Sequence, residues 1–385
     1  MTTTEATEVV RLGEIAQEVS VHVRDPIAEG LTRYVALEHI EPGSLKVERW
    51  GHLANGTSFT KRFRSGHLLF PKRRVYQRKV AVADFDGICS SDIIVIEADQ
   101  SRLLPEYLKF MAQTDPFFDH AIRTSSGSLS PRTKWKHLAN LSVRVPSLDR
   151  QRDIVAVLNA AERGLDATVR AGREAKALLV GLGERLIGDS GGETVETHKL
   201  GDVLGQVQYG LNTPPGTDGE HPILRMGNLS KGRVDLTDLK YVDLDAAEFE
   251  QYRLNQGDLL FNRTNSPDLV GKIALYDLDG SHVFASYLLR LVVNRQRALP
   301  EFVSFHLSRP TVQAQLRQLA TPGVSQSNIN PTSLKSISIP LPSLDRQGLI
   351  CDALSAVDTE SQRLDDHRLA LIAVRTQTAN ELIAE

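Results

Sequence analysis

Pro-Ser-Leu-Asp-Arg-Gln at residues 146–151 occurs a second time, unchanged, at residues 342–347. Each copy follows a short β-like run, at 141–145 and at 337–340, and each precedes a long stretch with helical periodicity. A six-residue identity so far apart in one chain is not expected by chance, and it indicates an internal repeat. The hexapeptide therefore predicts two related units, each followed by a long helix.

Other matches occur in the same order in both halves. They pair residues 12–14 with 200–202, 66–70 with 257–261, 84–87 with 277–280, and 104–107 with 299–302. We expect a mixed α/β (α+β) fold in which two similar globular units, at 1–146 and 193–342, are related by a pseudo-twofold repeat. The segments 147–192 and 343–385 are expected to hold the long helices, the first with a linker after it.

The two long helices are expected to pack against each other. The first, from about Asp149 to Ile187, has apolar and small residues at alternating steps of four and three, which is typical of a coiled-coil seam. The second, from about Asp345 to the C-terminus, has a narrow stripe that Ser361, Arg368 and Arg375 are expected to interrupt. Because a helix with one narrow apolar stripe needs a partner, we predict an antiparallel coiled coil.

Within the globular units, strands are expected at 34–40 and 93–97, one helix over 104–122, and loops at 125–131 and 321–330. The 385 residues, 41% of them hydrophobic, suit two or three domains with real cores. No apolar run of about 18 residues predicts a membrane span, and Met1 to Val10 lack a signal-peptide pattern. Cys89 and Cys351 are expected to be reduced and buried, which favours a cytoplasmic protein.

A cluster of basic residues stands out against a net charge of −3. Residues 60–79 contain no acidic residue, and three aromatic residues are interleaved. The candidates for DNA contact here are Lys61, Arg62, Arg64, Lys72, Arg73, Arg74, Tyr76, Arg78 and Lys79. This density predicts a loop or ribbon that contacts phosphates, with a solvated strand–turn–strand surface as the alternative.

The second half replaces this cluster with amides and one arginine. Arginine suits guanine and asparagine suits adenine, each through two hydrogen bonds. The candidate residues are Asn262, Arg263 and Asn265, together with Ser325, Gln326 and Asn328 from the loop. The alternative is an ordinary surface turn and a loop without a ligand.

Motifs for catalysis are missing from the sequence. There is neither a phosphate-binding loop of the ATPase kind nor a dinucleotide fingerprint after a strand. An Asn/Asp-Pro-Pro-aromatic motif for adenine methylation is absent, and the histidines lack zinc-site spacing. We therefore predict no catalytic residue and no metal site.

The chain resembles the DNA-specificity subunit of type I restriction–modification enzymes over essentially its whole length. Ile-Ser-Ile-Pro-Leu-Pro-Ser-Leu-Asp-Arg-Gln at 337–347, the two Gly-X-Leu-Leu-Phe segments, and 323–329 with Leu334 carry the resemblance. The first copy departs from this pattern at 143–146, which lacks one proline, and at 126–134, which lacks the glutamine and the Asn-Ile pair.

The resemblance implies a target-recognition domain in each globular unit, one for each half of a split double-stranded DNA sequence. The long helices would dock two methyltransferase subunits, which would hold S-adenosylmethionine and methylate adenine N6, and two motor-nuclease subunits would complete a restricting assembly. This chain would be non-catalytic and would bind no cofactor. We assign docking to the helix starts at Leu148, Asp149, Arg150 and Gln151 and at Leu344, Asp345, Arg346 and Gln347.

Three alternatives stay open. The chain could be a two-headed structural adaptor without DNA binding, and salt-sensitive binding to duplex DNA separates the two hypotheses. A stand-alone nuclease or methyltransferase would be active without partners. A specificity subunit of a defence system that does not cleave DNA would share every feature above.

Overall fold

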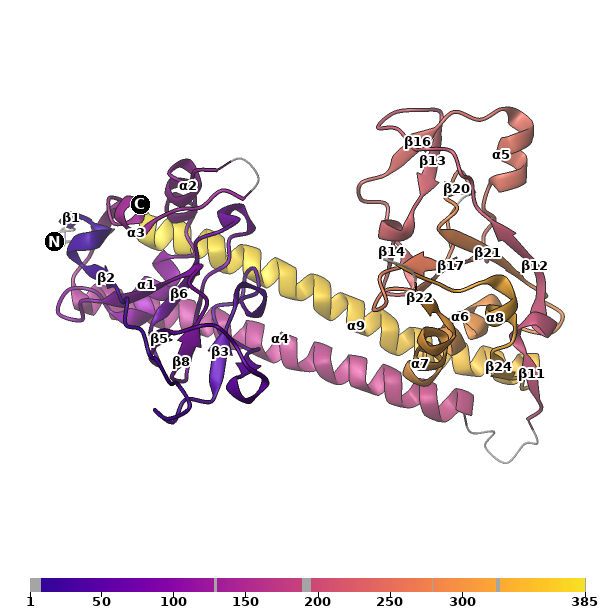
Figure 1. The fold of residues 1–385 in the computed structure, drawn as a ribbon, viewed down its shortest axis with the longest axis horizontal. Coiled ribbons are helices and arrows are strands. Elements are labelled where there is room, and N and C mark those ends of the chain that lie inside the picture. The colour runs from indigo at the N-terminus through magenta and orange to yellow at the C-terminus, as the bar shows by residue number, and fades with distance from the viewer. Residues whose placement is uncertain (1–7, 128–129, 189–194, 279, 323–325, 385) are drawn as a thin grey trace, which may run out of the picture. The chain divides into compact units, whose positions relative to one another are not determined.

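The computed structural model describes residues 8–127, 130–188, 195–278, 280–322 and 326–384. The chain divides into two compact units (Figure 1). Unit 1 contains residues 1–170 and 364–385, and unit 2 contains residues 171–363. The long helices α4 (Leu148–Gly188) and α9 (Leu344–Ala379) each contribute to both units, and the π-helix Asn380–Ala384 extends α9.

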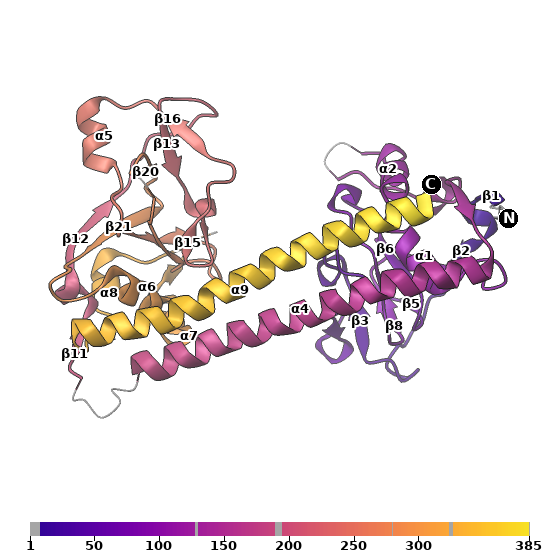
Figure 2. The ribbon, with the colours of Figure 1, turned by 180° about the vertical axis from the view of Figure 1, so that it is seen from behind.

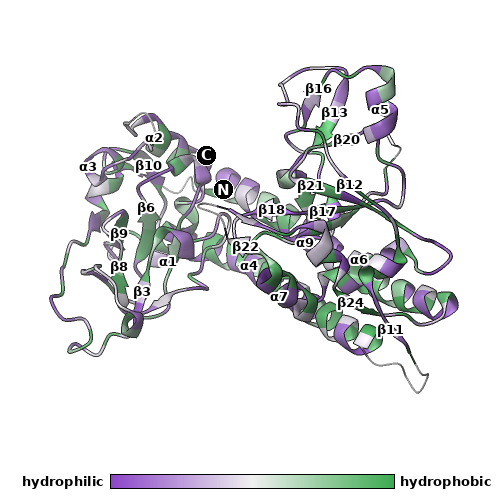
Figure 3. Ribbon diagram, turned by 45° about the vertical axis from the view of Figure 1, so that its right-hand side comes forward, coloured by the Kyte–Doolittle hydropathy of each residue, from purple (hydrophilic) through white to green (hydrophobic). Residues whose placement is uncertain are grey.

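Unit 1 is built on two four-stranded sheets, in the orders β2-β9-β6-β7 and β4-β3-β8-β5, with β1 and β10 paired separately. Its strands are β1 (Glu8–Arg11), β2 (Ala16–Glu18), β3 (Arg33–Val35), β4 (Gly51–His52), β5 (Lys61–Phe63), β6 (Leu68–Pro71), β7 (Ala81–Val82), β8 (Gly87–Cys89), β9 (Ile93–Ala98) and β10 (Ser142–Val145). Its short helices are α1 (Pro105–Met111), α2 (Asp115–Arg123) and α3 (Trp135–Leu138). Strands β6 and β9 are largely hydrophobic, because they lie inside the core (Figure 3).

Unit 2 is built on a six-stranded sheet, β12-β21-β17-β19-β15-β14, with three smaller pairings around it. Its strands are β11 (Thr197–Lys199), β12 (Leu204–Tyr209), β13 (His221–Leu224), β14 (Leu229–Ser230), β15 (Arg233–Val234), β16 (Lys240–Val242), β17 (Leu259–Asn262), β18 (Thr264–Asn265), β19 (Ile273–Leu275), β20 (Val283–Phe284), β21 (Leu288–Val293), β22 (Thr321–Pro322), β23 (Ser327–Asn328) and β24 (Ser338–Pro340). Its helices are α5 (Ala246–Tyr252), α6 (Pro300–Ser308), α7 (Pro310–Leu319) and α8 (Pro331–Lys335).

The repeat seen in the sequence is confirmed in the backbone. Strand β1 pairs antiparallel with β10, and β11 pairs in the same way with β24. The Leu12 N–H donates to the Leu141 carbonyl at 2.8 Å, and the Leu200 N–H donates to the Ile337 carbonyl at 2.7 Å. The Leu-Leu-Phe parts of the GHLLF and GDLLF segments begin β6 and β17, which pair antiparallel with β9 and β21.

The antiparallel pairing of the long helices follows from the contacts inside each unit. In unit 1, Ile154 and Leu158 near the start of α4 share a core with Ala379, at the end of α9. In unit 2, Ile187 near the end of α4 shares a core with Ile350, near the start of α9. Within each unit, the parts of the two helices also lie side by side in both views of the ribbon (Figures 1 and 2). The predicted antiparallel coiled coil is therefore confirmed.

Three local predictions need correction. The single helix expected over 104–122 is two helices, because the chain turns before Asp115 and Pro116 lies in the first turn of α2. The strand expected over 34–40 ends at Val35, and a short 3₁₀ turn follows. The loop expected at 321–330 contains the paired strands β22 and β23, so its ends form a hairpin.

The α9 stripe also differs from the prediction. Ser361 and Arg375, expected to interrupt it, are both buried. The Arg375 guanidinium pairs with the buried Glu162 carboxylate of α4 and donates to the Gly43 carbonyl at 2.8 Å. This charge therefore belongs to the buried seam.

Two further predictions concern burial and membranes. Cys89 and Cys351 are free and buried, as expected. Within the described ranges, no helix is both long and apolar enough to cross a membrane.

Candidate nucleic-acid interface

Lys72 in unit 1 and Arg263 in unit 2 occupy equivalent backbone positions. The Lys72 N–H donates to the carbonyl of Asp92 at 2.9 Å, and the Arg263 N–H donates to the carbonyl of Tyr287 at 3.0 Å. The Lys72 carbonyl accepts from the N–H of Thr133 at 3.0 Å, and the Arg263 carbonyl accepts from Ile329 at 2.9 Å. We call this pair of backbone hydrogen bonds the recognition frame, and each unit contains one such pair.

The residues beside the frame are equivalent as well. Arg73 faces Arg132 across an isolated antiparallel bridge, and Thr264 faces Asn328 in the β18–β23 pair. The long side chains also reach the same place. Lys72 Nζ donates to the Ser91 carbonyl at 2.6 Å, and Arg263 Nη1 donates to the Ser286 carbonyl at 3.4 Å. The two units thus hold different side chains on one scaffold.

In unit 2 the frame holds Arg263 against an aromatic ring and an amide. Its guanidinium carbon lies 4.9 Å from the centre of the Tyr209 ring, and Nη2 donates to Asn328 Oδ1 at 3.1 Å. Tyr209 and Tyr287 are 48% and 45% exposed, which is high for large aromatic residues in a folded domain. A fixed arginine beside exposed aromatic rings and amides can both hydrogen-bond and stack on nucleic-acid bases.

In unit 1 the frame gathers cations around Asp92. Its carboxylate forms an ion pair with Arg73 Nε at 2.8 Å, and it lies 3.8 Å from Lys72 Nζ and 4.0 Å from Arg132 Nη2. Like charges on opposed strand residues repel each other, and Arg73 and Arg132 are such a pair. The Asp92 carboxylate offsets this repulsion, so that three cations share one small area.

Several other cations of the predicted basic cluster are committed to protein partners. Lys61 is buried, and its ammonium lies 2.9 Å from Glu18 and 3.1 Å from the Ile93 carbonyl. Arg62 forms an ion pair with Glu29 at 2.8 Å. Because its ammonium is enclosed in the core, Lys61 is not a surface contact for DNA.

Arg78 and Lys79 are also engaged by the protein, whereas other members of the cluster are open to solvent. Arg78 pairs with Asp115 and lies over the Phe118 ring, and Lys79 donates to the Leu37 carbonyl at 3.3 Å. The exposed members are Arg64, Arg74 and Tyr76, the last being 60% exposed. These three can meet a ligand without breaking a core contact.

The amide candidates of unit 2 also differ in their burial and hydrogen bonding. Asn262 is fully buried at the end of β17, and its side-chain amide has no hydrogen-bond partner among the described residues, so it lies below the surface. Asn265 Oδ1 accepts from the N–H of Ser266 at 2.8 Å, which leaves its amide nitrogen available. Gln326 is exposed, and Ser325 lies outside the described residues.

The repeated hexapeptide holds its glutamine inside each unit. Gln347 Oε1 accepts from the Leu299 N–H at 2.8 Å, and its Nε2 donates to the carbonyls of Arg297 and Pro342 at 3.1 and 2.9 Å. Gln151 makes the same three bonds, to Leu104, Arg102 and Pro146, at 2.9, 2.8 and 3.0 Å.

Both glutamines are fully buried, so they cannot contact a partner subunit as we predicted. They join the start of each long helix to its globular unit instead. Among the remaining docking candidates, Asp149, Arg150, Leu344 and Asp345 are exposed, while Leu148 and Arg346 are half-buried.

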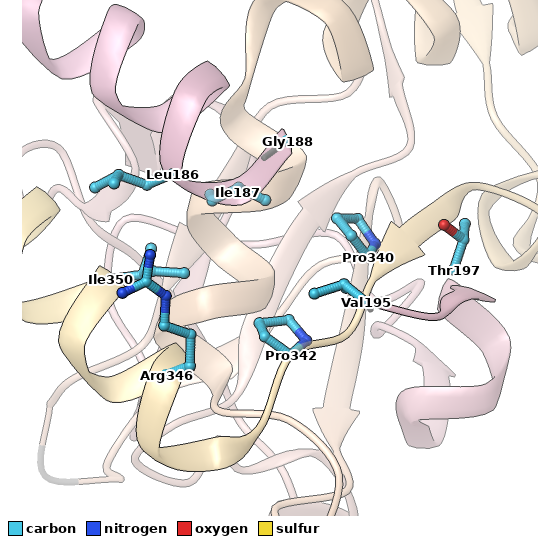
Figure 4. A pocket seen from close by; sticks show the side chains of 9 residues that line it. All are labelled: Leu186, Ile187, Gly188, Val195, Thr197, Pro340, Pro342, Arg346 and Ile350. Carbon is cyan, nitrogen blue, oxygen red and sulfur yellow. The ribbon is translucent and has the colours of Figure 1, made fainter. Parts of the chain in front are cut away.

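A pocket of about 120 Å³ lies beside the second hexapeptide, between the end of α4 and the start of α9 (Figure 4). Leu186, Ile187 and Ile350 give it an apolar wall, and Arg346 supplies the charge. Across the described parts of the chain, no group of three or more histidine, cysteine, aspartate or glutamate residues could hold a metal ion.

Sequence reasoning missed Tyr209, Tyr287, Asp92 and Arg132 as members of these surfaces. A signal for two of them was present. Ser-Asp-Ile-Ile at 91–94 aligns with Ser-Tyr-Leu-Leu at 286–289 once the repeat is extended from its matched segments. The equivalence of Asp92 and Tyr287 was therefore available before the structure.

Comparison with known proteins points to one family. Residues 192–372 match the family model of the type I restriction modification DNA specificity domain. The putative type I restriction enzyme MjaX specificity subunit of Methanocaldococcus jannaschii is 34% identical over 171 residues, which are 43% of this chain and 40% of the relative. The EcoKI specificity subunit of Escherichia coli K12 is 28% identical over 152 residues, 38% of this chain and 32% of the relative. The chain thus spans less than half the length of either relative.

Solved structures share the fold over nearly the whole chain. A chain from work on complex assembly and conformational transition of the type I R-M system gives a TM-score of 0.56 at 19% identity, and the match covers 98% of this chain and 97% of that one. The S subunit of a type I restriction-modification system from M. genitalium gives 0.55 at 10% identity, covering 99% and 97%. At these identities the likeness concerns the fold.

Proposed function

Because residues 192–372 match the family model of the type I restriction modification DNA specificity domain, we propose that the chain reads a bipartite DNA target, with one unit for each half-site. The observation that carries this proposal is the recognition frame. The same backbone arrangement occurs in both units, at Lys72 and at Arg263, but it presents different side chains. A scaffold that is repeated while its surface groups change is suited to reading two different sequences.

The chemistry of the two surfaces supports DNA as the ligand. Unit 1 presents cations grouped around Asp92, and the exposed Arg74 directly follows Arg73 of this group. Cations of this kind contribute phosphate affinity that depends on salt, without sequence information. Unit 2 presents Arg263 and Asn328, whose side chains match the base edges of guanine and adenine in the major groove. The two half-sites are therefore expected to differ in sequence.

The proposal includes partners for the long helices. Large apolar residues are exposed on α4 and α9, with Val157, Leu369 and Val374 in unit 1 and Leu178, Val180 and Leu349 in unit 2. We propose that two methyltransferase subunits cover such residues, hold S-adenosylmethionine and methylate adenine N6. Two motor-nuclease subunits would join them in a restricting assembly. This chain contributes recognition without a catalytic residue, and the cytoplasm is its place of action.

The test is to map modified bases in host DNA with and without this gene, while the partner genes stay intact. A split motif of methylated adenines that disappears with the gene supports the proposal and reveals the target. If methylation is unchanged while the partner methyltransferase is expressed, the chain is not its reader. The two-headed adaptor then becomes the better explanation.

A further inference from the structure

We infer that residues 72, 92 and 132 of unit 1, and residues 263, 287 and 328 of unit 2, are equivalent specificity triads. Each triad makes the base contacts of one half-site, and this inference rests on the proposed function. The first triad is Lys72, Asp92 and Arg132, and the second is Arg263, Tyr287 and Asn328.

The recognition frame makes the positions equivalent. Residues 92 and 287 accept the backbone bond of the first triad member, and each directly precedes the strand, β9 or β21, that pairs with β6 or β17. Residues 132 and 328 lie opposite residues 73 and 264 on the returning segment. Three stretches far apart in the sequence therefore meet in the same way in both units.

Residues 73 and 264 are not included in the triads, although they lie between these stretches. Thr264 is buried in unit 2, so this position faces the protein there. Arg73 is held in its ion pair with Asp92 at 2.8 Å, and its role is to orient the carboxylate. The triads thus contain the residues in and directly beside the frame whose side chains can reach a ligand in both units.

In unit 2 the fixed arginine keeps donors free. Each Nη nitrogen of Arg263 carries two N–H groups, and one on each is donated, to the Ser286 carbonyl and to Asn328. One N–H per nitrogen is left over, which is the number that a bidentate contact with guanine O6 and N7 requires. Asn328 retains its amide nitrogen for a base, and the exposed Tyr287 ring offers an apolar face to a thymine methyl group.

In unit 1 the triad combines an acceptor with two donors. The Asp92 carboxylate can accept from the N4 amino group of cytosine, while Lys72 and Arg132 can donate to guanine. The Asp92 side chain is 19% exposed, so one face remains available while the other binds the cations. The first half-site is therefore expected to depend on G·C pairs at the contacted positions.

The experiment uses the complete methyltransferase complex and maps its methylated motif for four variants. Asp92→Asn and Arg132→Ala change the first triad, whereas Tyr287→Ala and Asn328→Ala change the second. Asp92→Asn keeps the size of the side chain. The unaltered half of the motif reports in each case that the complex is folded and active.

We expect each variant to relax positions in one half-site only, with the other half and the gap unchanged. Discrimination at a relaxed position should fall roughly five- to 150-fold, because one base contact is lost. The matched controls are Arg102→Ala in unit 1, whose guanidinium pairs with Glu8, and Arg253→Ala in unit 2, which pairs with Glu250. Both controls should leave the whole motif intact.

Three results count against the inference. A motif unchanged in all four variants overturns the triads while the proposed function stands. The same loss in both halves overturns them too, because it indicates a general effect on the complex. If the unaltered chain directs no methylation motif at all, the proposed function fails, and the triads fail with it.

Discussion

Replacing Gln347 with alanine should destabilise unit 2 strongly, although the residue lies in the hexapeptide at the start of a long surface helix. Its amide makes three hydrogen bonds in a fully buried position. The alanine variant leaves the N–H of Leu299 and the carbonyls of Arg297 and Pro342 without these bonds. It also leaves a small cavity at the helix start.

The size of the effect follows from these groups. A typical hydrogen bond contributes about 0.5–1.5 kcal/mol net, and a buried group left without a partner costs about 1–3 kcal/mol. Three bonds that share one side chain therefore contribute on the order of 2–5 kcal/mol to the free energy of unfolding. For a unit of this size the loss corresponds to a fall of roughly 5–15 °C in Tm.

The assay should separate the two units, because each has its own glutamine. Hydrogen exchange at the Leu299 amide, read by mass spectrometry together with thermal unfolding, reports on unit 2. The Leu104 amide reports in the same way on unit 1, where Gln151→Ala is the matched change. Gln347→Ala should accelerate exchange at Leu299 and leave Leu104 protected, and Gln151→Ala should do the reverse.

The neighbouring arginines supply the control. Arg150→Ala and Arg346→Ala alter the same hexapeptides without touching the three bonds, and we expect little change in Tm. Gln347→Glu should be at least as damaging as the alanine variant, because a carboxylate faces two carbonyl oxygens that need donors. If the free energies of unfolding of the Gln347→Ala and Arg346→Ala variants agree within about 0.5 kcal/mol, the glutamine does not stabilise the unit as reasoned.

Three further predictions concern charged groups. Arg375→Met should lower the free energy of unfolding, measured in urea, by about 3–5 kcal/mol, because the buried Glu162 carboxylate loses its partner. Adding Glu162→Leu should recover most of this loss. Burial lowers the pKa of His306 to about 4, below its ordinary 6.5. As the pH falls, this histidine is therefore protonated in the unfolded chain before it is protonated in the folded one. Tm should fall as the pH drops from about 6.5 to about 4, and the fall should be smaller in the His306→Gln variant. Arg74→Ala should reduce the salt slope of DNA affinity by about one.

Much of the fold could be predicted because its signals are local. A repeated hexapeptide and an apolar periodicity depend on neighbouring residues, so the starts of both long helices and the end of α4 were found within a residue. The helix expected to continue to the C-terminus ends as an α-helix at Ala379, and a π-helix follows. The break between α1 and α2 was missed although Pro116 marks it. A proline in the first turn of a new helix and one inside a continuous helix have similar surroundings in sequence, so the pattern alone did not separate them.

The candidate site was predictable in kind but not in detail. Arg263 and Asn328 were chosen for the bases they suit, and the structure brings them within 3.1 Å of each other. Asn262, chosen for the same reason, is the last residue of β17 and lies in the core. The side chains of a strand alternate between its faces, and which face is buried depends on the neighbouring strands.

By itself, the sequence determined that the chain contains an internal repeat and two long helices and lacks a catalytic motif. Sequence identity and apolar periodicity can both be recognised in the linear sequence. Only the tertiary structure decided which charges are available. Lys61 is paired with Glu18, and Arg375 with Glu162, by parts of the chain that return from far away. The recognition frame arose in the same way, since the backbone bonds that align Lys72 with Arg263 join three separate stretches in each unit. A charged residue can be identified in the sequence, but its burial and its partner depend on where the rest of the chain folds back.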